Sequence, residues 1–100
     1  MQLGWFNATE ARNFGAHLAE MLATDLSKKE KSKREFSAAK RARLLQKVFV
    51  QVRQFKQTRK LNFYKKAKLG NSFKWKLLEL GFEPGLVDEL THELMLRMSD

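Results

Sequence analysis

Apolar residues recur every three or four positions along most of this 100-residue chain, which is the spacing of helices that bury one face. The spacing holds over four stretches, at about 7–26, 33–60, 63–80 and 84–98. No stretch of useful length alternates between apolar and polar residues as a half-buried strand does. We therefore predict an all-α fold, a small bundle of four helices that forms a single domain over residues 1–100.

Residues that favour helix starts stand at the borders of these stretches. Asn7 and Ser32 are each followed three positions later by a glutamate, which is the pattern of a capping box, and Asn62 can cap the third helix. Pro84 suits the first turn of the fourth helix. The charged residues at about 27–33, between the first two helices, are predicted to form a mobile linker.

The third helix has a well-marked end and one weak point. Gly81 can adopt the left-handed conformation that closes many helices, and Phe82 then contacts Leu77 as in a Schellman motif. Gly70 costs a helix about 1 kcal/mol relative to alanine. A break near Gly70 is therefore an alternative to one continuous helix.

The position of each side chain around its helix predicts which residues face the core. In the last three helices these residues are Leu45, Val48, Phe49, Val52 and Phe55, then Phe63, Ala67, Gly70, Phe73, Leu77 and Leu80, then Leu86, Val87, Leu90, Leu94 and Met98. The first helix has an apolar face, and its other side carries Ala16, Ala19 and Ala23. Small side chains there indicate either burial between neighbouring helices or a surface offered to a partner.

The net charge of +9 is distributed unevenly along the chain. Residues 28–76 contain eighteen Lys and Arg against two acids, a net charge of +16. The remainder contains two bases against nine acids, a net charge of −7. Such segregation bears on surface potential and on partners rather than on the fold.

Composition excludes several classes of protein. The chain has no cysteine, so disulfides and thiolate metal sites are excluded, and a reducing compartment is favoured. Residues 1–7 lack the basic and apolar segments of a secretion signal. The apolar runs are far shorter than the ~20 residues that span a bilayer. We expect a cytoplasmic protein.

Few residues could carry catalysis or hold a metal. His17 is predicted to be a partly buried structural histidine. Asp88 and His92 are one turn apart and could share a metal, but a specific site usually needs three or four protein ligands. No Gly-rich phosphate loop, GxSxG or HExxH motif occurs. We expect no enzymatic activity, no metal and no cofactor.

The basic middle of the chain favours an anionic partner, because lysine and arginine release condensed counterions when they meet phosphates. The candidate binding residues are Lys40, Arg43 and Lys47 in the second helix and Tyr64, Lys65, Lys68, Trp75 and Lys76 in the third. Aromatic rings beside lysines can stack on unpaired nucleotides. Three alternatives stay open: the rings belong to the core, the lysines form an ordinary solvated face, or the acidic helices neutralise the basic ones.

Two other interpretations of the basic helices have less support. Leu69-Gly70-Asn71-Ser72 resembles the turn of a helix-turn-helix, but the apolar residues that the motif needs at Asn71 and near Lys76 are absent. The second helix has an apolar stripe and a basic back, as membrane-surface helices do, but it lacks tryptophan.

The sequence therefore predicts a non-catalytic binding module for an anionic partner, with DNA or RNA as the first candidate. The alternative is a protein–protein adaptor or a self-associating subunit, which would use the alanine side of the first helix and the acidic fourth helix. Neither a membrane nor a small-molecule substrate is expected as a partner.

Overall fold

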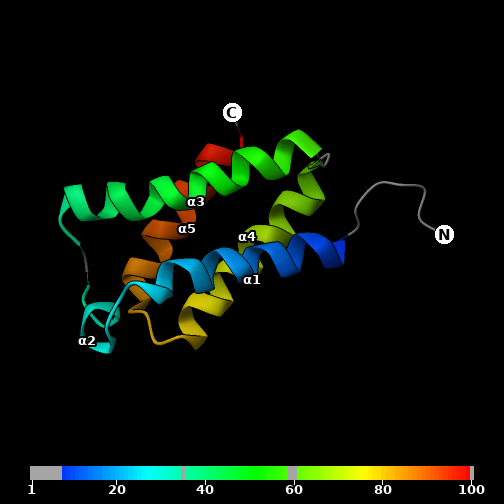
Figure 1. The fold of residues 1–100 in the computed structure, drawn as a ribbon. Helices are drawn as coiled ribbons and strands as arrows, with labels where there is room; N and C mark the ends of the chain where they lie inside the picture. The colour runs from blue at the N-terminus through cyan, green and yellow to red at the C-terminus, as the bar shows by residue number, and fades with distance from the viewer. Residues whose placement is uncertain (1–7, 35, 59–60, 100) are drawn as a thin grey trace.

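The computed structural model describes residues 8–34, 36–58 and 61–99, and these form five helices (Figure 1). The helices are α1 (Ala8–Thr24), α2 (Lys28–Lys31), α3 (Ala38–Thr58), α4 (Phe63–Glu79) and α5 (Pro84–Met98). In Figure 1, α1 and α3 run along the molecule, and α4 and α5 cross them. The all-α prediction is confirmed, whereas the predicted count of four helices is wrong by one short helix.

The additional helix, α2, falls within the segment that the sequence predicts as a linker. Ser27 caps it: the Ser27 hydroxyl accepts from the backbone N–H of Glu30, and the Glu30 carboxylate accepts from the backbone N–H of Ser27. This reciprocal pair satisfies two amide donors that would otherwise lack partners in a one-turn helix. The mobility expected of this segment stays a prediction.

The long helix α3 begins at Ala38, later than the predicted start at 33. The Ser37 hydroxyl accepts from the backbone N–H of Lys40, as an N-cap side chain does. Ser32 is instead the C-cap residue of α2, where its hydroxyl donates to the carbonyl of Lys29. The other predicted partners, Asn7 and Glu35, lie outside the described residues.

Helix α4 is continuous through Gly70, so the predicted alternative of a break is wrong. Asn62 caps its start, with the side-chain oxygen accepting from the backbone N–H of Lys65 at 2.8 Å. Gly70 lies against α5: a Cβ at this position would be 2.4 Å from Met95 Sδ. The glycine is therefore explained by close packing of two helices rather than by a bend.

The end of α4 confirms the predicted Schellman motif. Gly81 has a φ of +96°, and its N–H donates to the carbonyl of Leu78 at 3.1 Å. The N–H of Phe82 donates to the carbonyl of Leu77 at 3.1 Å. Pro84 then opens α5, as predicted.

Helices α1 and α4 approach each other closely at Gly15. A Cβ on Gly15 would lie 2.3 Å from the carbonyl oxygen of Leu69, so only glycine allows this backbone-to-backbone contact. The Ser72 hydroxyl donates to the carbonyl of Arg12 at 2.5 Å across the same seam. The seam fixes how α4 is rotated, and hence which of its residues face outward.

Most of the predicted core residues are buried. The core contains Ala11, Leu18, Ala19, Leu22, Leu26, Phe36, Leu44, Leu45, Val48, Phe49, Val52, Leu69, Phe73, Leu77, Phe82, Leu86, Val87, Leu90, Leu94 and Met98. Phe55 and Leu80 are half-buried. The prediction is wrong for Phe63, which is 88% exposed, and for Ala67. The inward face of α4 is centred on Phe73 and includes Leu69, so both residues lie at or beyond its edge.

Candidate nucleic-acid interface

The outward face of α4 carries a stripe of four side chains, Tyr64, Lys68, Asn71 and Trp75. Their spacing of four, three and four residues places them on one side of a helix, opposite the buried Phe73. Tyr64 is 59% exposed and Trp75 is 64% exposed. The alternative that these rings belong to the core is therefore wrong.

Each exposed ring of the α4 stripe has a lysine beside it. Lys68 Nζ lies 5.7 Å from the centroid of the Tyr64 ring, and Lys74 Nζ lies 5.9 Å from that of Trp75. These distances are within the range of cation–π contacts, which are weak at exposed positions. The arrangement places a stacking surface and a positive charge together twice on one helix.

The other two basic residues predicted on α4 lie on the flank that faces α1. Lys76 Nζ is 3.5 Å from a carboxylate oxygen of Glu20 and 3.7 Å from one of Glu79. Lys65 is half-buried near the start of the helix. The charge of Lys76 is therefore partly offset within the protein, and the stripe depends more on Lys68 and Lys74.

A hollow of about 390 Å³ lies between the stripe and α1. Its lining residues are Arg12, Ala16, Lys68, Asn71, Ser72, Trp75, Lys76 and Glu79. Sequence reasoning missed Arg12, Asn71 and Lys74. Lys74 could have been found from its place next to Trp75, whereas Arg12 is 60 residues from Ser72 and is brought there by the packing of α1 on α4.

The three predicted residues of α3 lie in a different place. Lys40, Arg43 and Lys47 line a separate hollow together with the acids Asp25 and Glu30. Lys40 forms an ion pair with Glu30, and Lys47 forms one with Asp25, while Arg43 is exposed. Asp25, the partner of Lys47, comes from the acidic part of the chain outside residues 28–76, as the alternative of neutralisation expects. Glu30, the partner of Lys40, is one of the two acids within the basic segment itself.

The Glu30 carboxylate is a stronger acid in the folded protein than a glutamate in water. The hydrogen bond from Lys40, and then the one from the backbone of Ser27, lower the pKa of Glu30 from 4.5 to about 2. Both contacts favour the charged carboxylate. Glu30 is therefore ionised at any physiological pH and remains a partner for Lys40.

The alanines proposed as a partner surface divide into two kinds. Ala19 is fully buried within the chain, and Ala16 and Ala23 are half-buried. The interpretation as burial between neighbouring helices therefore holds for Ala19, which leaves little of the alanine side of α1 for a partner.

The two histidines, His17 and His92, both lie on the surface. His17 is exposed rather than partly buried as predicted, and His92 is also exposed. No group of three or more acids and histidines that could hold a metal occurs among the described residues.

The helix-turn-helix interpretation can also be compared with the structure, whereas the membrane-surface interpretation of α3 stays a prediction. The helix-turn-helix interpretation is wrong, because Leu69 to Ser72 lie inside α4. Within residues 8–34, 36–58 and 61–99, no helix has the length and apolar character needed to cross a membrane.

Comparison of the chain with protein-family models, with curated proteins and with solved structures finds no match.

Proposed function

We propose that the protein is a non-catalytic module that binds single-stranded nucleic acid in the cytoplasm through the outward face of α4. The observation that carries this proposal is the exposure of Tyr64 and Trp75 on one stripe, each with a lysine beside its ring. Large aromatic side chains are usually buried at least in part. Two aromatic side chains on one solvent-exposed helix face therefore indicate a binding surface.

A single strand fits this face better than a duplex does. Unpaired bases can stack on aromatic rings whatever their sequence, whereas the bases of a duplex are already stacked on one another. Tyr64 and Trp75 are eleven residues apart, or ~16 Å along the helix axis. A strand lying along α4 can therefore reach both rings and pass Lys68 between them.

The lysines of α4 supply the second part of the affinity. Five lysines and one acid lie between Phe63 and Glu79. If three or four of these lysines neutralise phosphates, the logarithm of the binding constant falls with the logarithm of the salt concentration with a slope of about −2 to −3. A duplex should bind more weakly, because it gains the charge contacts alone.

The test is the anisotropy of a labelled oligothymidylate, titrated at low salt with the wild-type protein and with two variants. Tyr64→Ala and Trp75→Ala are each expected to weaken binding by about 5- to 150-fold, because each removes one stacking platform. Phe63→Ala is the matched control: it removes an exposed ring from the same helix at a position about 100° around the axis from Tyr64. If the wild-type protein does not bind the single strand, the proposal is wrong.

The adaptor alternative has less support from the geometry. A partner would have to use the half-buried Ala16 and Ala23 or the exposed side of α5, where Leu96 is 54% exposed. An isolated exposed leucine is common on protein surfaces. Sedimentation as a monomer at all concentrations would remove the self-associating form of this alternative.

A further inference from the structure

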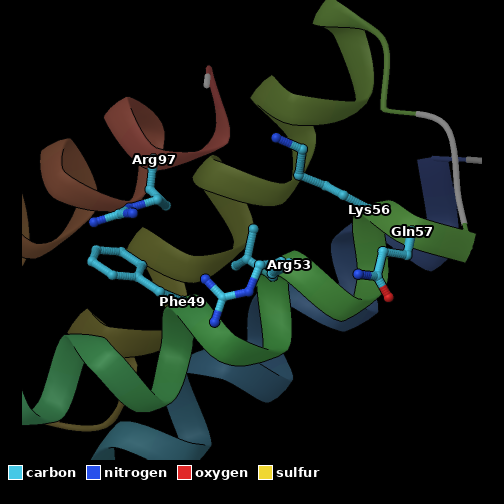
Figure 2. Close-up of a pocket in the computed structure, with 6 residues that line it drawn as sticks. Phe49, Arg53, Lys56, Gln57 and Arg97 are labelled. Carbon is cyan, nitrogen blue, oxygen red and sulfur yellow. The ribbon is translucent and has the colours of Figure 1, made fainter.

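A third basic hollow, of about 310 Å³, lies between α3 and α5, away from the α4 stripe (Figure 2). It is lined by Phe49, Val52, Arg53, Lys56, Gln57 and Arg97. Phe49 and Val52 are buried core residues, so they form an apolar floor. Three of the lining side chains are cations, and none of those described is an acid.

Arg97 and Lys56 each contact a neighbouring group in this hollow. The Arg97 guanidinium carbon lies 4.4 Å from the centroid of the Phe49 ring, which places the planar group against the apolar floor. Arg53 follows Phe49 by one helical turn, and Figure 2 shows both arginine side chains close to Phe49. Lys56 Nζ donates to the carbonyl of Met98 at 3.3 Å and so ties the end of α5 to α3.

The two arginines differ from the other bases near the helix junctions. Lys40, Lys47 and Arg41 form ion pairs with Glu30, Asp25 and Glu89. Neither Arg53 nor Arg97 forms an ion pair with any residue that the structure describes. An unpaired positive charge over an apolar, concave surface attracts anions more strongly than the same charge on a flat, solvent-exposed surface, because less water screens it.

We propose that this hollow binds a phosphomonoester that carries an apolar or aromatic body, as a nucleotide does. Guanidinium groups match phosphate oxygens with paired hydrogen bonds. The body would lie on the floor of Phe49 and Val52, and the amide of Gln57 offers both a donor and an acceptor at the rim. The volume falls at the lower end of the range for small-ligand pockets.

The same chemistry has two sources, a free nucleoside monophosphate and the terminal phosphate of a nucleic-acid strand. The site uses α3 and α5 and no residue of the α4 stripe, so it stands whether or not α4 binds single strands. An experiment can therefore disprove binding of single strands to α4 without disproving binding in this hollow, and the reverse also holds.

The test is a titration of the ¹⁵N-labelled protein with adenosine monophosphate, followed by amide chemical shifts. Saturable shifts are expected at Val52, Arg53, Gln57 and Arg97, with a dissociation constant below about 1 mM. Adenosine and inorganic phosphate, each with half of the required chemistry, are expected to bind at least about tenfold more weakly. The proposal is overturned if the monophosphate gives no saturable shifts there, or if either half binds as tightly as the whole.

Matched variants assign the binding to the two arginines. Arg53→Gln and Arg97→Gln are each expected to weaken binding about tenfold, which is the loss of one charge-assisted contact. Arg43→Gln is the control, since it removes one exposed arginine from the same helix α3 outside the hollow. Equal binding by the Arg53 variant, the Arg97 variant and the control overturns the proposal.

The source of the phosphate is separated with a protein that lacks the α4 rings, Tyr64→Ala/Trp75→Ala. A 5′-phosphorylated oligothymidylate and its 5′-hydroxyl form are added in turn. If the phosphorylated strand shifts the amide signals of Arg53 and Arg97 and the 5′-hydroxyl strand does not, the ligand is the phosphorylated end of a strand. Shifts with adenosine monophosphate but with neither strand identify a free nucleotide.

Discussion

The outward face of α4 and the corner formed by α2 and the start of α3 are both rich in lysine, but their lysines have different neighbours. At the corner, Lys40 and Lys47 pair with Glu30 and Asp25. On α4, Lys68 and Lys74 lie beside exposed aromatic rings.

This difference shows that charge counted along a sequence does not reveal which lysines are paired with acids in the fold. The acids that neutralise the corner lie 10 and 22 residues from their lysine partners. A lysine that is already paired with an acid has to give up that contact in order to bind a phosphate. The comparison therefore favours α4 over the start of α3 as a nucleic-acid surface.

The largest expected effect comes from breaking the seam that orients α4. In Gly15→Ala the new methyl would meet the backbone oxygen of Leu69 at 2.3 Å, and backbone cannot move aside as a side chain does. We expect a loss of about 3 kcal/mol or more in the free energy of unfolding, and a melting temperature lower by at least about 10 °C. The melting temperatures of both proteins are measured by recording circular dichroism during thermal denaturation.

Gly70→Ala is the control for this substitution. Its methyl would meet Met95 Sδ, the far part of a flexible, half-buried side chain, and alanine favours the helix by about 1 kcal/mol. The loss of stability should be clearly smaller than for Gly15→Ala. An equal or larger loss would mean that α5, rather than α1, fixes the position of α4.

The next largest effect is expected on oligothymidylate binding when one lysine is neutralised on α4, compared with one lysine neutralised at the corner. Lys68→Gln should weaken oligothymidylate binding about five- to tenfold at ~50 mM salt, because one phosphate contact is lost. It should also make the salt slope shallower by less than about one. Lys47→Gln makes the same change in net charge but removes a lysine that is already paired with Asp25, so binding should change less than about twofold. Equal losses in the two variants would show that total charge, rather than the α4 stripe, determines affinity.

The smallest effect concerns stability at the corner and its dependence on pH. The pKa of Glu30 is lowered to about 2 in the folded protein, so its ion pair contributes stability above the ordinary pKa of 4.5. That contribution is lost as the pH falls from 4.5 towards 2. Glu30→Gln should therefore melt slightly below the wild type at pH 7, and most of the difference should be lost by pH 2, where about half of the folded molecules have a protonated Glu30. A difference that stays constant over this range would contradict the account.

The parts of the fold that depend on residues close together in the sequence were predictable. The three-to-four-residue spacing predicts α1, α3, α4 and α5, and the Asn62 cap and the Gly81 motif fix both ends of α4. The inward face of α5 was predicted completely, because one regular stripe decides it. Helix α2 was missed, since four charged residues show no apolar period and a single cap stabilises them.

The candidate site was predictable only in part. Lys65, Lys68, Lys76 and the two rings of the stripe were identified, but Lys74 was missed. The exposure of Phe63 and Trp75 depends on how α4 is rotated against α1, which the contact at Gly15 decides. The ion pairs of Lys40 and Lys47, the place of Arg12 and the hollow between α3 and α5 all join residues far apart in the chain. Local patterns carry no information on such contacts.

The most direct test of the central claim is the fluorescence of Trp75 during a titration with unlabelled oligothymidylate. The Trp5→Phe variant leaves Trp75 as the only tryptophan of the chain. If a base stacks on its exposed ring, the emission should be quenched in a saturable way, and added salt should reverse the quenching. Binding without any change in Trp75 emission would contradict the account, because the strand would then lie elsewhere on the protein.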